Sequence, residues 1–268
     1  MYGYWYSVRQ HYSFTSQELK ELFLTALAFA FMISSHYEGL FQFVDSDLRL
    51  VISGSFVGFL IFSTIIVFLS LYIHVALQKL VGIRLGYFVK YNYWANGILL
   101  GLFLSIITFG RIPLIIPLSA FILPGSIVLE HIPKLRLGKF RYGINAKDIA
   151  RVALMGPLSH VFIITFLGFI YFATGKNPII SRLIIANILL MMYSMLPVPR
   201  IDSPIRMDGA TDGLGIFFYS RWVYVLCLLT FLFYGILVWV SSVFSFIGAF
   251  ILALLTVVIY SITLKQAS

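Results

Sequence analysis

The most constraining feature of the chain is a series of long stretches without Lys, Arg, Asp or Glu. They cover 22–37, 50–78, 91–110, 112–129, 152–175, 183–199 and 222–264. A helix that crosses a lipid bilayer needs about 20 apolar residues, because each residue rises about 1.5 Å. The last stretch is long enough for two such helices, so we expect a break near Ser241 and Ser242. The pattern therefore predicts about seven to eight membrane segments.

Composition excludes the other broad classes of protein. Hydrophobic residues make up 60% of the 268 residues and charged residues 11%, whereas a soluble domain has about 25% charged residues. Cys227 is the single cysteine, which excludes a disulfide scaffold. We predict an all-α fold, a polytopic transmembrane helix bundle that forms one membrane domain over 1–268. Segment 112–129 contains Pro113, Pro117 and Pro124, so both a re-entrant loop and a full crossing stay open there.

The basic residues predict the orientation of this bundle. Lys and Arg favour cytoplasmic loops, and most of the 19 in this chain lie near the N-terminus and in loops 79–90, 130–151 and 200–221. With eight crossings these loops share one side, so we expect a cell-membrane protein with both termini in the cytoplasm. This bias and contact with anionic lipid account for the net charge of +9. No nucleic-acid partner is expected, because no binding module surrounds the basic residues.

Ionisable residues inside the membrane are costly and are therefore candidates for function. His74 lies late in segment 50–78, and Gln78 follows it by one helical turn on the same face. A zinc protease helix has the pattern H-E-x-x-H, in which two His bind the metal and the Glu is the general base. Val75 stands at the Glu position here and Gln78 at the position of the second His.

Several short motifs occur in an order that extends this comparison. They are FTSQELKELFLTALAFAF at 14–31, the His74 helix at 74–86, FILPGSIVL at 121–129, MGPLSH at 155–160 and YSMLPVPRID at 193–202. In order and spacing they resemble the opening helix, zinc helix, Pro-Gly membrane loop, Ala-Gly-Pro-Leu-x-Asn helix and Asn-x-x-Pro-x-Pro-x-x-Asp-Gly stretch of the site-2 protease family. These proteases are intramembrane zinc metalloproteases, and the likeness is greatest to the archaeal members. The resemblance implies a protease-like core over about 50–221, followed by a helix pair over 222–264.

The resemblance also assigns individual residues. His74 matches the first zinc His, and the zinc Asp matches Asp202 without a gap or Asp212 after an insertion, with Asp208 as a third choice. His160 replaces an Asn of the family and could serve as a substitute ligand. The residues that the resemblance places in substrate binding are Ser194, which replaces the family's Asn, together with Pro197, Pro199, Gly156 and Pro157.

The substitutions in the zinc helix favour an inactive protein. An amide is a poor zinc ligand compared with imidazole, thiolate or carboxylate, and the valine side chain cannot accept a proton. The resulting expectation is a pseudoprotease without catalytic residues or a bound cofactor, which binds single-span membrane proteins or serves as a subunit of a membrane complex. Two alternatives remain: an active zinc protease that combines His74, His160 and an Asp, and a transporter whose path these residues line.

Overall fold

The computed structural model describes residues 4–37, 41–44, 47–50, 54–107, 125–132, 144–197, 211–241 and 244–267. Its helices are α1 (Tyr4–His11), α2 (Ser16–Tyr37), α3 (Gly54–Leu85), α4 (Ala95–Ile107), α6 (Ala146–Ala173), α7 (Pro178–Ser194), α8 (Asp212–Tyr219), α9 (Arg221–Leu237) and α10 (Ser245–Ala267). Its strands are β1 (Phe41–Val44), β2 (Asp47–Leu50), β3 (Tyr87–Tyr93) and β4 (Gly125–His131). The described part of the chain is thus mostly helical, in agreement with the predicted class.

Four of these helices, α2, α3, α6 and α10, are long and apolar enough to cross a membrane. Three shorter apolar helices, α4, α7 and α9, accompany them. Large apolar side chains lie exposed along most of these helices, as expected for surfaces that contact lipid rather than water. The predicted membrane protein with transmembrane helices agrees with these properties.

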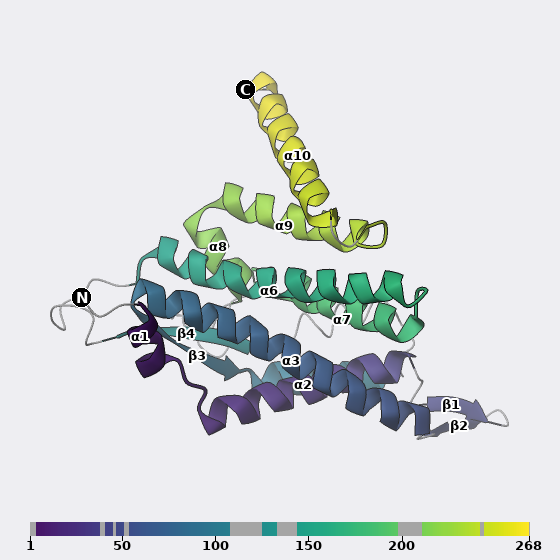
Figure 1. The fold of residues 1–268 in the computed structure, drawn as a ribbon. Coiled ribbons are helices and arrows are strands. Elements are labelled where there is room, and N and C mark those ends of the chain that lie inside the picture. Colours follow the sequence, from purple (N-terminus) through teal and green to yellow (C-terminus); the bar gives the residue numbers. More distant parts are fainter. Residues whose placement is uncertain are drawn as a thin grey trace.

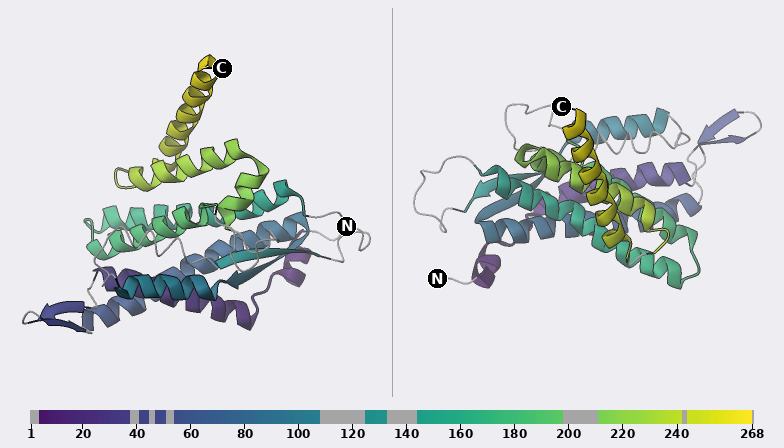
Figure 2. Two further views of the ribbon diagram at one scale, coloured as in Figure 1. Left: turned by 180° about the vertical axis from the view of Figure 1, so that it is seen from behind. Right: turned by 90° about the horizontal axis from the view of Figure 1, so that it is seen from above.

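The helices stack in layers that bring distant parts of the sequence together (Figures 1 and 2). Helices α2, α3 and α4 form one layer, α6 and α7 lie on α3, and α9 lies beyond them with α10 projecting from it. Successive long helices run in alternating directions. The end of α3, the start of α6 and the start of α9 therefore lie at the same end of the bundle as the β3–β4 sheet (Figure 1).

Some helices extend beyond the charge-free stretches of the sequence. Helix α3 continues past Lys79 and Arg84 to Leu85, and α6 begins at Ala146, capped by the side chain of Asn145. The predicted break in 222–264 is confirmed, because α9 ends at Leu237 and α10 begins at Ser245. Helices therefore tolerate charged residues at their ends, where polar partners are within reach.

The strands were not predicted, and they correct two of the expected segments. The apolar stretch 91–110 does not begin as a helix, because β3 extends to Tyr93 and α4 begins at Ala95. The end of stretch 112–129 is strand β4, which pairs antiparallel with β3 from Tyr87↔His131 to Tyr93↔Gly125. Residues 108–124 lie outside the described part, so the crossing or re-entry of that stretch stays a prediction. Aromatic and β-branched residues favour strands, and alternate residues of β3 are buried.

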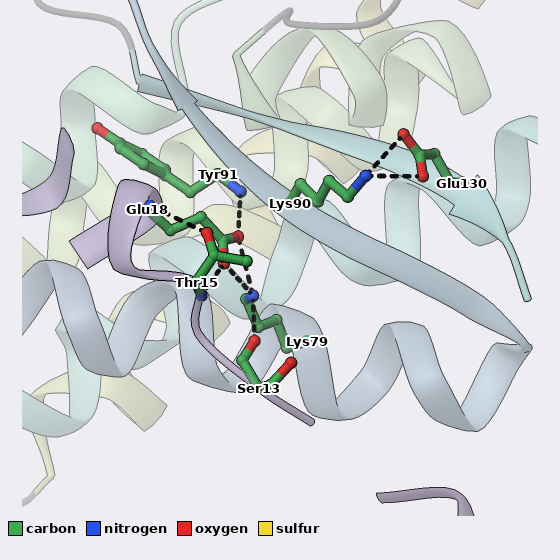
Figure 3. A network of polar contacts seen from close by, with 7 residues as sticks. All are labelled: Ser13, Thr15, Glu18, Lys79, Lys90, Tyr91 and Glu130. Carbon is green, nitrogen blue, oxygen red and sulfur yellow. Dashed lines mark hydrogen bonds and ion pairs between the residues drawn. The ribbon is translucent and has the colours of Figure 1, made fainter. Parts of the chain in front are cut away.

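A buried ion pair ties the start of α2 to α3 and β3 (Figure 3). Lys79 Nζ donates to Glu18 Oε1 at 2.9 Å and to the Ser13 carbonyl at 2.8 Å. The backbone N–H of Tyr91 also donates to Glu18 Oε1, at 3.0 Å. Glu18 and Thr15 cap the helix reciprocally, through Thr15 N to Glu18 Oε2 at 2.8 Å and Glu18 N to Thr15 Oγ1 at 3.1 Å. Every partner of this pair is thus supplied by the protein.

The same helix makes a second contact with the strand. The backbone N–H of Tyr93 donates to Glu21 Oε2 at 3.2 Å. The Tyr91 and Tyr93 N–H groups lie on the edge of β3 away from β4, since Ile132 N donates to Gly86 O and residues pair alternately from there. The two carboxylates of α2 therefore occupy hydrogen-bond positions along the outer edge of β3.

Replacement of Lys79 tests how much the buried ion pair contributes to the free energy of unfolding. In Lys79→Met, Glu18 would remain as a buried charge without its cation, which typically costs about 3–5 kcal/mol. The matched control is Lys90→Met, because Lys90 pairs with Glu130 at 3.0 Å with both side chains about half exposed. Such surface pairs contribute about 0–1 kcal/mol. Reversible unfolding of the purified protein in detergent measures both free energies. Equal effects would contradict the assigned role of the buried pair.

Candidate functional site

The predicted site lies where α3 faces α6 and α8. His74 and Gln78 occupy one face of α3 with Val75, and both Val75 and Gln78 are completely buried. Helix α8 begins at Asp212, after Thr211, whose hydroxyl donates to the Leu196 carbonyl at the end of α7. This arrangement directs the Asp212 carboxylate toward the C-terminal third of α3.

Asp212 receives contacts from both polar residues of the α3 face. His74 Nε2 lies 3.0 Å from Asp212 Oδ2, and Gln78 Nε2 donates to Asp212 Oδ1 at 2.8 Å. The structure therefore brings together His74, the residue at the second His position and one of the three candidate Asp residues. The other two, Asp202 and Asp208, lie outside the described residues.

The opposite side of the His74 ring contacts His160 of α6. His74 Nδ1 and His160 Nε2 are 3.2 Å apart, and His160 Nδ1 lies 3.2 Å from Asn187 Oδ1 on α7. Asn187 Nδ2 donates to the Leu183 carbonyl at 3.0 Å. A continuous polar chain thus connects four helices, in the order Asn187, His160, His74, Asp212 and Gln78.

Hydrogen-bond direction along this chain assigns the protons. Because Asn187 uses its nitrogen for the Leu183 carbonyl, its oxygen must accept from His160 Nδ1. A neutral His160 then accepts at Nε2, so His74 Nδ1 is the donor of that contact. His74 Nε2 is left facing Asp212 across 3.0 Å, a distance that requires one proton between the two atoms. His160 and Asn187 thereby fix the orientation of the His74 ring.

Gly156 allows the α6 backbone to approach the His74–Asp212 pair. A Cβ atom at this position would contact the His74 ring and would lie 2.5 Å from Asp212 Oδ2. Pro157 follows inside the helix, and the Ser159 hydroxyl donates to the Gly156 carbonyl at 2.6 Å. Of the two α6 residues that the resemblance placed near substrate, Gly156 therefore lies against the His74–Asp212 pair.

A cavity of about 40 Å³ lies beside the pair. Its polar and apolar lining includes His74, Val75, Asp212, Tyr193, Ser194 and Tyr91. The Ser194 hydroxyl donates to the Met191 carbonyl at 2.9 Å, within its own helix. Of the remaining predicted residues, Pro197 follows α7 as an exposed residue and Pro199 lies outside the described part.

Two functional candidates were missed by sequence reasoning. Asn187 is a completely buried polar residue in an apolar stretch, but its amide is not ionisable, so the criterion that selected His74 and His160 did not select it. Tyr193 lines the cavity, but it is one of 16 tyrosines in the chain, most of which suit a membrane interface. Its position is visible only in three dimensions.

The donor set does not fit a catalytic zinc ion, which takes three protein ligands and a water. His74 Nε2 and Asp212 Oδ2 supply two suitable atoms. His160 faces the other nitrogen of His74, so it cannot share an ion with Nε2. Gln78 offers a buried amide oxygen without a hydrogen-bond partner in the described structure, and amides are weak zinc ligands. Within the described ranges no group of three or more His, Cys, Asp or Glu residues could hold a metal.

Comparisons of the chain with protein-family models, with curated proteins and with solved structures found no match. The residues and geometry described above are therefore the basis for the functional interpretation.

A larger residue at position 156 tests the packing of the site. Gly156→Ala forces a methyl group against His74 and Asp212, and such overpacking typically costs about 1–3 kcal/mol. Gly58→Ala on α3 is the control, because a Cβ there meets no atom within 4 Å. We expect this control to be neutral or stabilising by up to about 1 kcal/mol. Thermal unfolding in detergent distinguishes the two variants, and an unchanged Gly156→Ala protein would rule out the close approach.

Proposed function

We propose that the chain is a catalytically inactive, membrane-embedded relative of the site-2 proteases that binds single-span membrane proteins. The observation that carries the proposal is the meeting of three separate motifs at one point. His74 and Gln78 of α3, Gly156 of α6 and Asp212 of α8 were selected by their resemblance to family motifs. Asp212 contacts His74 and Gln78, and Gly156 lies against His74 and Asp212.

The large separation in sequence between the contacting residues strengthens the proposal. Gln78 and Asp212 are 134 residues apart in sequence, so no helical periodicity relates them. Their contact requires α8 to fold back onto the C-terminal third of α3, which is the arrangement expected if Asp212 stands at the position of the family's zinc Asp. The proposal extends this likeness to a protease-like core over about 50–221.

Inactivity follows from the chemistry of two side chains. A hydrocarbon at position 75 cannot act as the general base, a function that typically contributes about 10²–10⁴-fold to the rate. The amide at position 78 donates to Asp212, where the family has the second zinc-binding imidazole. The scaffold would therefore retain a site for a client chain without the means to cleave it. An accessory subunit of a larger membrane complex would likewise bind another chain without cleaving it.

The proposal includes a topology. We infer about seven to eight membrane segments, to which α2, α3, α4, α6, α7, α9 and α10 contribute. If the predicted stretch 112–129 also crosses, both termini lie in the cytoplasm with the β3–β4 sheet. Helices α9 and α10 form the proposed C-terminal pair. The alternating helix directions and the basic loops support this orientation.

Restoration of the two lost side chains tests the proposal. The parent protein should not cleave a single-span substrate in nanodiscs, and a chelator should not change its melting temperature. The Val75→Glu/Gln78→His double variant regains a base and a ligand, and Val75 lines the cavity, which gives the longer carboxylate room. We expect this variant to bind zinc stoichiometrically and to cleave the substrate in a zinc-dependent reaction.

The matched control is the same double variant with Asp212→Asn, which should lose zinc affinity by at least tenfold. Metal analysis and gel-based cleavage measure both properties. Chelator-sensitive cleavage by the parent, or stoichiometric zinc that disappears in His74→Ala, would instead establish an active protease with altered ligands.

A further inference from the structure

An apolar groove lies between α2 and α4, away from the polar chain of the candidate site. Helix α4 lies at the edge of the bundle beside α2 (Figure 2). The groove has a volume of about 650 Å³. The side chains that line it come mainly from these two helices and include Leu24, Leu27, Phe31, Leu99, Leu102 and Ile106.

The walls of this groove are accessible from outside the protein. Leu24 is 48% exposed, Leu27 38% and Leu99 64%. Such apolar surface is unfavourable in water but matches the hydrocarbon of a bilayer. Helix α2 is one of the helices that are long and apolar enough to cross a membrane, so the groove opens toward lipid.

The length of the groove distinguishes between two kinds of occupant. Its lining on α4 extends from Ala95 to Ile106, which corresponds to about 16 Å along a helix. One leaflet contributes half of a hydrocarbon core of roughly 30 Å, so the groove matches an acyl chain that runs from the interface to the bilayer centre. A membrane-spanning helix of about 20 residues is roughly 30 Å long and would extend well beyond the groove.

A cation stands at one end of the groove. Lys20 precedes Leu24 by four residues and Leu27 by seven, so the three side chains lie on one face of α2. Lys20 is exposed, and its side chain makes no hydrogen bond or ion pair within the described residues. The neighbouring Glu21 accepts from the Tyr93 N–H instead. The groove thus combines apolar walls with a free positive charge at its end.

We propose that the groove between α2 and α4 binds one acyl chain of an anionic phospholipid, and that Lys20 binds the phosphate of its headgroup. The lipid belongs to the leaflet on the side of the β3–β4 sheet, because α2 begins beside β3 at that end of the bundle (Figure 1). This inference concerns a lipid rather than a client chain, so it stands or fails separately from the proposed function.

Lipid binding to the purified full chain tests the inference. The protein is delipidated in detergent and titrated with phosphatidylglycerol or with phosphatidylcholine that has the same two oleoyl chains. Native mass spectrometry gives the dissociation constant of the first bound lipid. We expect one saturable site that prefers phosphatidylglycerol by about fivefold, the ratio that one basic residue near an anionic lipid provides.

Lys20→Gln should abolish this preference and leave the binding of phosphatidylcholine unchanged, because only the headgroup contact is lost. Lys147→Gln is the matched control. Lys147 is an exposed residue in the first turn of α6 and does not line the groove. The control should keep the parent preference.

Leu99→Trp tests the acyl-chain part of the site. The larger side chain occupies space in the groove, so both lipids should bind roughly tenfold more weakly, the effect of about two CH₂ groups that lose their contacts. Leu69→Trp is the control, because Leu69 is 51% exposed on α3 and does not line the groove. Thermal unfolding of both variants shows that the fold is retained.

Three results would overturn the inference. A headgroup preference that survives in Lys20→Gln would exclude this lysine as the partner of the phosphate. Lipid binding that is unchanged in Leu99→Trp would show that the bound lipid lies elsewhere on the bundle. Displacement of phosphatidylglycerol by a single-span peptide of Leu and Ala, which itself binds more weakly to Leu99→Trp, would show that the groove takes a client helix instead.

Discussion

The absence of water from a bilayer core governs the interior of this protein, because each polar atom there must find its partner within the chain. Two networks meet this requirement at different levels of the bundle. One joins Glu18, Lys79 and the N–H of Tyr91 where α2 begins. The other connects four helices from Asn187 to Gln78 through His160, His74 and Asp212. Among the described residues, the buried side-chain atoms without a partner are Gln78 Oε1, Trp94 Nε1 and the Tyr193 hydroxyl, and those of Gln78 and Tyr193 belong to residues at the second network.

The second network also explains how helices stay together at a site that resembles a metal centre. In a zinc protease the ion joins ligands from separate helices. Here the His74–Asp212 contact at 3.0 Å joins α3 to α8 directly, and Gln78 adds a second bond to the same carboxylate. The His74–Asp212 contact and the hydrogen bond from the Gln78 amide thus hold α3 and α8 together at the site. The same residues that weaken a metal site stabilise the packing.

The sequence was sufficient for the helical class and for the break between α9 and α10, because apolar length and a polar interruption are local signals. It was insufficient for β3 and β4, since their apolar residues merge with the neighbouring membrane stretches. At the site, helical periodicity placed His74 and Gln78 on one face, whereas the sequence left the choice between Asp202 and Asp212 open, with Asp208 third. The fold brings Asp212 to α3, and the other two lie outside the described residues. The orphaned hydroxyl of Tyr193 depends on what surrounds it, and no sequence pattern specifies that.

The contacts of Glu18 and Glu21 with β3 have a consequence for the small sheet. An exposed strand edge invites pairing with another chain and thereby aggregation. The carboxylates on Tyr91 N and Tyr93 N substitute for the carbonyls of a third strand. A foreign segment cannot extend the two-stranded sheet on that side unless α2 detaches. Helix α2, a part of the membrane core, thereby also protects the protein against misassembly.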